Sequence, residues 1–350
     1  MAADENRELI GTGIRWQRPR MPGNHPEFLL VSSIIRVHRL YPRLSLLLVN
    51  SHDFAILLSV AIDHGFPGLS FDTETFTGVH LLMLKTALVT GASSGLGREL
   101  VRQLVRERGM TVLATARRRD LLESLVAELP PGSVLIEPGD LADAAFRSIL
   151  WQRAESLTGG LDLVVNNAGL GNYAAFQDQE PDAIQRIFDV NVMALMDLTQ
   201  RAAKHMSARG SGQILQISSV LGFVGLPYSS VYVASKHAVN GLVKSLRYEL
   251  RGTGVRIWAA CPGRTVSEFS QVALADPSAN GPVPDGEPTE KVVRAILRGL
   301  NGRSTFLLPT WRAWLPVTLA HWLPGPYEWF MNRWGPKHFR QEIEKAKGPL

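Results

Sequence analysis

Two side chains four residues apart, Tyr232 and Lys236, could together move a proton. They lie in a segment with helical periodicity, where a spacing of four places the phenol and the ammonium on one face. A phenol has a reference pKa of ~10 and is a poor base at neutral pH, but a nearby ammonium favours its ionised form. Such pairs are also common on solvated helix surfaces, so further residues must decide whether this one is functional.

Other polar side chains interrupt apolar segments upstream of this pair. Ser219 ends an apolar run of strand length, thirteen positions before Tyr232. Asn191 stands among apolar residues in a helical segment, where an amide is out of pattern. The sequence Asn166-Asn167-Ala168-Gly169 closes another apolar run, and its plainest interpretation is an Asn-Gly turn. In a parallel sheet, polar residues that end neighbouring strands meet at one crevice.

A glycine-rich stretch, Thr90-Gly91-Ala92-Ser93-Ser94-Gly95-Leu96-Gly97, follows an apolar run and leads into an amphipathic segment. This order predicts a strand, a phosphate-binding loop and a helix. One glycine permits the tight turn, one lets the backbone approach a pyrophosphate, and one lets the helix pack close to the strand. The helix then offers unpaired N–H groups to an anion. The alternative is a chance glycine-rich turn.

The segments that must position these residues alternate, from Leu84 onward, between apolar runs of strand length and longer periodic segments. This alternation predicts a parallel sheet covered by helices on both faces. We expect strands at 84–90, 111–116, 133–137, 161–166, 212–218, 255–260 and 305–308, and helices near 95–108, 119–129, 143–157, 181–208, 229–251 and 289–300. Right-handed crossovers then give a single α/β, doubly wound domain over 83–310, with its ligand crevice at the carboxyl ends of the strands.

The order and spacing of these motifs resemble the short-chain dehydrogenase/reductase family. The matching residues are Thr90-Gly-x-x-x-Gly-x-Gly97, Asp140-Leu141, Asn166-Asn-Ala-Gly169, Asn191, Ser219, Tyr232-x-x-x-Lys236 and Pro262-Gly263. The resemblance covers roughly residues 84–310. It implies a Rossmann-fold, NAD(P)-dependent oxidoreductase that interconverts carbonyl and alcohol groups.

The resemblance also implies roles for four catalytic residues. Tyr232 would be the general acid in carbonyl reduction and the general base in alcohol oxidation. Lys236 would supply the charge beside the phenol and hold the hydroxyls of the nicotinamide ribose. Ser219 would hydrogen-bond the substrate oxygen as charge develops on it. Asn191 would anchor a water that leads protons from Lys236 to solvent.

The implied cofactor site spans the glycine-rich loop and several later strand ends. Its contacts would be Gly91, Ser93, Ser94, Gly95, Leu96, Gly97, Asp140, Leu141, Asn167, Ala168, Gly169, Tyr232, Lys236, Pro262, Gly263 and Ser267, the last standing where the family commonly has threonine. An acidic residue after the second strand would accept from the adenosine ribose, but the chain has Arg117 and Arg118 there. Guanidinium groups suit a 2′-phosphate, so we expect NADP(H) in preference to NAD(H). The alternative interpretation is that these arginines begin a helix and serve only the solubility of the protein.

Composition limits the other classes of function. The formal charge of +5 is modest and the basic residues are scattered, which does not indicate a nucleic-acid partner. Cys261 is the only cysteine, so an intrachain disulfide and a cysteine-based metal site are excluded, and we expect no metal. We predict a cytosolic protein that acts on a small molecule and forms a homodimer or homotetramer.

The two ends of the chain differ from the predicted domain. Residues 1–82 lack a sustained period; they are either a start-site artefact, with the natural protein beginning at Met83, or an appended segment that packs on the domain. Residues 311–350 hold five tryptophans between several prolines. Aromatic and basic residues together suit a cap over an apolar substrate pocket, a subunit contact or a membrane interface, and we favour the first two.

We therefore predict an NADPH-dependent reductase, or the reverse alcohol dehydrogenase, for an apolar substrate. The apolar bias rests on the tryptophan-rich tail and on Val220, Leu221, Phe223, Leu226 and Tyr228. One alternative is a cofactor-binding sensor or scaffold without turnover, and another is a peripheral membrane protein whose enzyme domain is secondary. The intact set of Ser219, Tyr232 and Lys236 argues against a sensor, because a sensor needs no proton donor.

Overall fold

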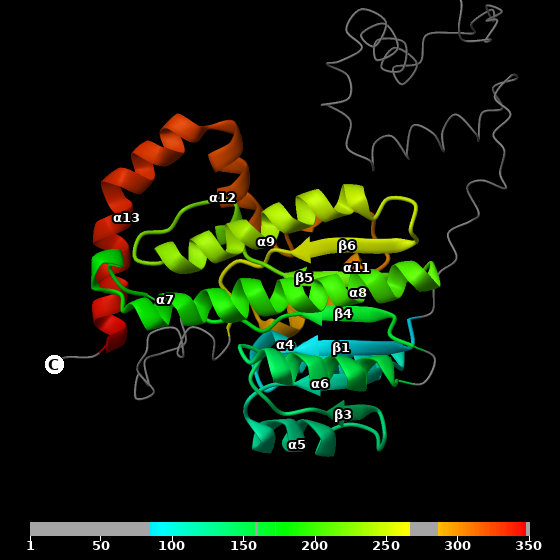
Figure 1. The fold of residues 1–350 in the computed structure, drawn as a ribbon. Helices are drawn as coiled ribbons and strands as arrows, with labels where there is room; N and C mark the ends of the chain where they lie inside the picture. Colours follow the sequence, from blue (N-terminus) through cyan, green and yellow to red (C-terminus); the bar gives the residue numbers. More distant parts are fainter. Residues whose placement is uncertain (1–83, 158–159, 172, 267–285, 348–350) are drawn as a thin grey trace, which may run out of the picture. The chain divides into compact units, whose positions relative to one another are not determined.

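The computed structural model describes residues 84–157, 160–171, 173–266 and 286–347 (Figure 1). Its strands are β1 (Thr86–Thr90), β2 (Thr111–Thr115), β3 (Val134–Ile136), β4 (Leu163–Asn166), β5 (Gly212–Ile217), β6 (Val255–Ala260) and β7 (Phe306–Leu307). They form one parallel sheet in the order β3-β2-β1-β4-β5-β6-β7. The strand order reverses between β1 and β4, which is where a doubly wound sheet opens a ligand crevice. The predicted fold class is confirmed.

Helices cover both faces of the sheet (Figure 1). One face carries α4 (Gly95–Arg108), α5 (Arg119–Ala127) and α11 (Thr289–Gly299), and the other carries α6 (Ala144–Glu155), α8 (Leu195–Arg209) and α9 (Ser230–Glu249). Along β1, Leu88 belongs to one apolar cluster while Ala87 and Val89 belong to the other. This two-sided burial explains why the strands are continuous apolar runs without polar alternation.

The segment predicted as one helix over 181–208 contains a widened turn. It consists of α7 (Pro181–Phe188), a π-helical turn η3 (Asp189–Ala194) and α8. Two short 3₁₀ turns, η2 (Phe176–Asp178) and η4 (Val220–Gly222), lie in neighbouring loops. π-Helical turns inside α-helices are frequent at functional sites, and this one contains Asn191.

The tryptophan-rich C-terminal tail is helical, although the sequence predicted no regular element there. It forms α12 (Trp311–Trp322) and α13 (Pro324–Lys347). Pro324 and Pro326 lie in the first turn of α13, where a backbone N–H has no helical partner to lose. Figure 1 shows the corner between α12 and α13 standing clear of the sheet and its covering helices. Within the described residues, no helix is long and apolar enough to cross a membrane.

Two predictions from the sequence concern residues outside the described ranges. They are the identity of the leader, residues 1–82, and the contact of Ser267 with the cofactor.

Candidate active site

Three of the predicted catalytic side chains come together beyond the carboxyl end of β5. Ser219 is the N-cap of η4, and its Oγ accepts a hydrogen bond from the Leu221 N–H at 3.1 Å. Tyr232 and Lys236 lie one turn apart near the start of α9. Tyr232 also forms a side-chain hydrogen bond with Ser219. The predicted serine and tyrosine are therefore in direct contact, although they come from different elements.

Lys236 lies deeper than Tyr232, behind its ring. The Lys236 Nζ is 5.5 Å from the centre of the Tyr232 ring and donates a hydrogen bond to the Ile217 carbonyl oxygen at 2.9 Å. Lys236 is buried, whereas Tyr232 retains partial exposure. The ammonium is thus held between the end of β5 and the phenol that faces the crevice.

Burial governs the electrostatics of this pair. It lowers the pKa of Lys236 to about 8. Burial also raises the pKa of Tyr232 far above its ordinary value, with a contribution from Tyr173, and the hydrogen bond from Ser219 opposes that shift only in part. The sequence led us to expect a phenol whose pKa is lowered by Lys236. That expectation was wrong for the protein by itself, because the loss of water around the phenol is the largest cause of its pKa shift.

Replacing Lys236 with Met should stabilise the protein at neutral pH. A lysine in the unfolded chain titrates near ~10.4, so below about pH 8 the folded state bears the full cost of a buried ammonium. This cost disappears as the pH rises towards ~10.4, because over that range the unfolded state binds more protons than the folded state. After allowing for the lost hydrogen bond to Ile217, we expect a gain of about 1–2 kcal/mol in the free energy of unfolding at neutral pH.

Urea unfolding would measure the difference in the free energy of unfolding between the parent and the Lys236→Met variant. The difference should be largest near neutral pH and smaller above about pH 9. Lys244→Met is the matched control, because Lys244 is an exposed lysine on the same helix. A Lys236→Met protein that is less stable than the parent at neutral pH would contradict the assigned burial cost.

Asn191 fits its π-helical turn because its side chain bonds outside the helix. Its Oδ1 accepts from the Leu170 N–H at 2.7 Å, and its Nδ2 donates to the Leu170 carbonyl at 2.8 Å and to the Ser235 Oγ at 3.0 Å. A Cβ placed on Gly169 would lie 3.4 Å from the Asn191 Oδ1 and 3.8 Å from the Lys236 Nζ. Gly169 therefore lies close to both Asn191 and Lys236.

The glycine-rich loop leaves no room for side chains where a phosphate group would approach. Gly91 and Gly95 have φ angles of 68° and 54°, in the left-handed region that favours glycine. A Cβ on Gly97 would overlap the Gly91 carbonyl and the Asn167 amide. The N-cap residue of α4, Ser94, makes no side-chain capping bond, so it leaves the first N–H groups of the helix for another acceptor. The loop is shaped to accept an anion at a helix N-terminus.

The Asn167 segment is fastened to this loop. The Asn167 Nδ2 donates to the Thr90 carbonyl at 2.9 Å and to the Gly91 carbonyl at 3.2 Å. The backbone N–H groups of Asn167 and Ala168 both donate to the Thr90 Oγ1 at 3.0 Å. These hydrogen bonds join the residues that follow β4 to the end of β1.

Arg118 and Arg117 occupy different places. Arg118 donates to the Ser93 Oγ at 3.2 Å and to the Ser94 Oγ at 2.8 Å, which sets its guanidinium on the glycine-rich loop. Arg117 is exposed, and its charge contributes to the low pKa of Asp140. Of the two predicted arginines, Arg118 is the one in contact with loop residues.

Asp140 is held by a residue that the sequence did not single out, Arg186 on α7. Burial would raise the Asp140 pKa, but hydrogen bonds from Arg186 and from the Ala142 N–H, at 2.9 Å, lower it below its usual value. Asp140 is therefore ionised at neutral pH, next to the buried Leu141. No local signal marks Arg186, because it lies 46 residues from its partner.

The Pro262-Gly263 loop lies beside the turn that follows Ser219. The Val220 N–H donates to the Pro262 carbonyl at 3.1 Å, which ties the turn after Ser219 to this loop. A Cβ on Gly263 would lie 3.5 Å from the Ala313 Cα, so α12 begins against the same loop. The C-terminal helices therefore border the site.

A second residue missed by the sequence analysis, Asn240, joins the elements that carry the catalytic groups. Its Oδ1 accepts from the Ser218 Oγ at 2.7 Å, and its Nδ2 donates to the Gly222 carbonyl at 2.9 Å. A Cβ on Gly222 would overlap the Asn240 amide and approach within 2.8 Å of the Lys236 carbonyl. The sequence signal that could have identified Asn240 is its spacing, because it stands four residues after Lys236 and so lies on the same helix face.

Comparison with known proteins agrees with this geometry. The family described as short chain dehydrogenase matches residues 85–277. An uncharacterized oxidoreductase of Myxococcus xanthus (strain DK1622) is 37% identical over 247 residues, which cover 69% of this chain and 94% of that relative.

Two solved structures are similar in fold. A short-chain dehydrogenase from Sphingobium yanoikuyae in complex with NADPH is 29% identical, with a TM-score of 0.61 over 71% of this chain and 96% of that chain. A short chain dehydrogenase/reductase from Burkholderia phymatum in complex with NAD has a TM-score of 0.63 over 68% of this chain and 92% of that chain. The latter is 24% identical, which shows the fold alone.

Fold and site together define an oxidoreductase of the Rossmann type that uses a nicotinamide cofactor. The chain belongs to the short-chain dehydrogenase/reductase family.

Proposed function

We propose that this enzyme interconverts a carbonyl and an alcohol on an apolar substrate and uses NADP(H) in preference to NAD(H). The observation that carries the proposal is the contact between Ser219 and Tyr232, with the buried Lys236 behind the phenol ring. A proton donor and a second hydrogen-bonding group are then in contact, and a positive charge lies behind the ring of the donor. A non-catalytic sensor would have no use for this set.

In the proposed reduction, Tyr232 donates its proton to the substrate oxygen, and in the oxidation it takes the proton back. Its high pKa suits donation. In the oxidation, a positive charge on Lys236 would favour the ionised phenol. Ser219 donates a hydrogen bond to the same oxygen as negative charge develops there. Asn191 orients the backbone at Leu170 and, through Ser235, the start of α9.

The residues present fit a nicotinamide dinucleotide. The loop at Gly97 has no room for a side chain, and the first turn of α4 is open to a phosphate group. The cofactor's nicotinamide ring would exchange a hydride with the substrate carbon. Asp140 offers an ionised acceptor on the adenosine side, and Lys236 would hold the ribose next to Tyr232.

Arg118 should determine the preference for NADPH. Its bonds to Ser93 and Ser94 place a guanidinium beside the loop, where it can pair with a 2′-phosphate that NADH lacks. Replacing Arg117 and Arg118 with Ala should lower kcat/KM for NADPH by about tenfold or more, at ~1.5–3 kcal/mol for each charge-assisted bond, and leave NADH nearly unchanged.

The matched control is Arg119→Ala, because Arg119 is exposed and lies 3.8 Å from Glu123, one turn along the same helix. Steady-state values of kcat/KM for the parent and the variants, with NADPH and with NADH, would test the cofactor preference. Equal kcat/KM for NADPH and NADH in the parent enzyme would refute the preference.

The apolar substrate class rests on the loop after Ser219 and on α13. Leu221, Leu226 and Tyr228 are partly exposed there, whereas Phe223 packs edge-on against Phe306 with ring centres 5.2 Å apart. Tyr228 has a φ of 63°, a conformation that costs a non-glycine residue about 1 kcal/mol and that clusters at functional sites. On the other side, Gly335 of α13 lies close to Pro227, since a Cβ on Gly335 would be 3.5 Å from the Pro227 Cγ. These contacts support a cap of apolar character over the substrate.

The proposed reaction is tested by following the absorbance of the reduced cofactor with a panel of ketones, aldehydes and alcohols of increasing apolar size. We expect turnover that depends on NADPH and improves with apolar substituents. Binding of NADPH without turnover of any member would favour the sensor.

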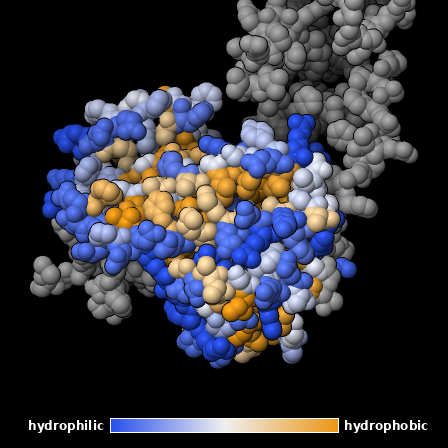
Figure 2. Space-filling model, viewed as in Figure 1, coloured by the Kyte–Doolittle hydropathy of each residue, from blue (hydrophilic) through white to orange (hydrophobic). Residues whose placement is uncertain are grey.

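A homodimer or homotetramer remains a prediction. Figure 2 shows hydrophobic residues gathered over α9 on one face of the molecule, a surface that a second copy could cover. Light scattering during gel filtration would give the oligomeric state.

A further inference from the structure

The exposed apolar side chains of the described residues are concentrated on the C-terminal helices. Of fourteen large hydrophobic residues that are exposed, nine lie between Trp311 and Trp334. They are Trp311, Trp314, Leu315, Leu319, Trp322, Leu323, Trp329, Phe330 and Trp334. Single exposed apolar residues need no explanation, but a cluster of this kind marks an interaction site.

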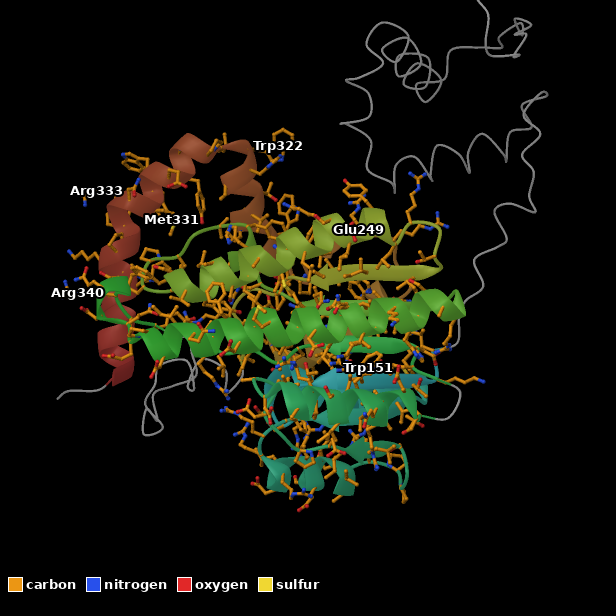
Figure 3. All side chains as sticks on the ribbon, in the orientation of Figure 1. Trp151, Glu249, Trp322, Met331, Arg333 and Arg340 are labelled. Carbon is orange, nitrogen blue, oxygen red and sulfur yellow. The ribbon has the colours of Figure 1, made fainter. Side chains whose placement is uncertain are left out.

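The inner sides of α12 and α13 pack against the rest of the described protein. α12 buries Ala313 against the Pro262-Gly263 loop. Along α13, Tyr327, Met331, Gly335 and Phe339 recur every four residues, and they are the only positions from Pro324 to Arg340 that are not exposed. Figure 3 shows Met331 on the side of α13 that faces the rest of the protein.

The corner between the helices carries the most exposed aromatic side chains. Trp322 and Trp329 are 67% and 66% exposed, and Leu323 and Phe330 are each more than half exposed. Figure 3 shows Trp322 at the outer end of α12, and Figure 1 shows this corner projecting from the body. We call Trp322, Leu323, Trp329 and Phe330 the aromatic corner.

Basic residues continue from the aromatic corner along the outer side of α13. Arg333 and Arg340 point outward in Figure 3, away from Met331. Between Trp311 and Arg340 the chain has four basic residues, Arg312, Arg333, Lys337 and Arg340, and one acidic residue, Glu328. The formal net charge of this stretch is therefore +3, with histidine counted as neutral.

We propose that the aromatic corner and the basic side of α13 dock on an anionic lipid surface. Tryptophan and phenylalanine prefer the boundary between headgroups and acyl chains, and arginine and lysine prefer the lipid phosphates just outside it. The positive charge favours lipid over a second copy of the chain, because two copies would bring like charges together. The corner lies on the surface and does not span the bilayer. The proposal does not depend on the reaction, although it would place the substrate crevice near a source of apolar molecules.

The full chain is tested by flotation with vesicles of phosphatidylcholine alone and with vesicles that contain about a third phosphatidylglycerol. We expect binding to the anionic vesicles that is about tenfold or more stronger than to the neutral ones, and that weakens in high salt.

Two sets of variants separate the aromatic and basic contributions. The double change Trp322→Ala and Trp329→Ala should lower binding about tenfold or more, and Phe176→Ala, an aromatic exposed to a similar degree elsewhere, should not. The double change Arg333→Gln and Lys337→Gln should remove most of the preference for anionic vesicles. All these residues are exposed, and unchanged thermal unfolding with NADPH would show that the variants are folded.

Three results would overturn the proposal. One is no binding to either vesicle, and another is binding that the Trp322 and Trp329 changes leave intact. The third is a dimer in the absence of lipid that these changes dissociate, which would assign the corner to a second copy of the chain. None of these results bears on carbonyl reduction, so the reaction and the docking surface are tested separately.

Discussion

Replacing Tyr232 with Phe should lower turnover by about 100- to 10,000-fold and leave the affinity for NADPH nearly unchanged. The change removes only the phenolic oxygen, which bonds to Ser219, and keeps the ring in front of Lys236. Without that oxygen, negative charge would develop on the substrate with no positioned proton donor. Steady-state reduction of any substrate found in the screen, together with NADPH titration by fluorescence, would measure both effects.

The Lys236→Ala variant is the comparison for Tyr232→Phe. This variant should lose cofactor affinity as well as turnover, because Lys236 is assigned to the ribose and to the phenol. A Tyr232→Phe enzyme that turns over at the parent rate would show that the catalytic assignment is wrong, and the sensor hypothesis would then move ahead.

Replacing Ser219 with Ala should lower kcat by about 100- to 1,000-fold, the usual cost of removing one hydrogen-bond donor from a developing oxyanion. The affinity for NADPH should change little, because Ser219 faces the substrate oxygen. Ser219→Thr keeps a hydroxyl and should retain far more activity than Ser219→Ala.

The alanine variant also loses the bond to the Leu221 N–H, so its thermal unfolding with NADPH must be compared with that of the parent. Parent-like kcat in a folded Ser219→Ala enzyme would remove this residue from the proposed mechanism.

The sheet and the main site residues could be predicted because their signals are local. Strands such as β1 are buried on both faces and therefore read as continuous apolar runs. Asn167 and Ser219 follow strands of the sheet, and the parallel topology places both at the carboxyl ends of the strands, where Ser219 contacts Tyr232. Gly91 and Gly97 were identifiable because their positions admit no side chain.

The missed features depend on contacts between distant parts of the chain. Arg186 is an ordinary basic residue of an exposed helix until Asp140 is placed beside it. The π-helical turn around Asn191 arises because its amide bonds to Leu170, 21 residues away. α12 and α13 were missed because their prolines suggested breaks. Pro324 and Pro326 lie where a helix accepts proline, but Pro316 and Pro336 lie inside the two helices.

The close approach of Gly222 and Asn240 restricts how this enzyme can be altered by directed evolution. Any side chain at position 222 competes for the volume that the Asn240 amide occupies, and removing that amide alone leaves the Ser218 hydroxyl and the Gly222 carbonyl without their partner. The two positions are therefore epistatic: changes at 222 and 240 will not add, since each alters the cost of the other. A combinatorial library aimed at the substrate loop should keep Gly222 and Asn240 fixed, because a side chain at 222 would also lie 2.8 Å from the Lys236 backbone carbonyl, which a smaller residue at 240 does not move.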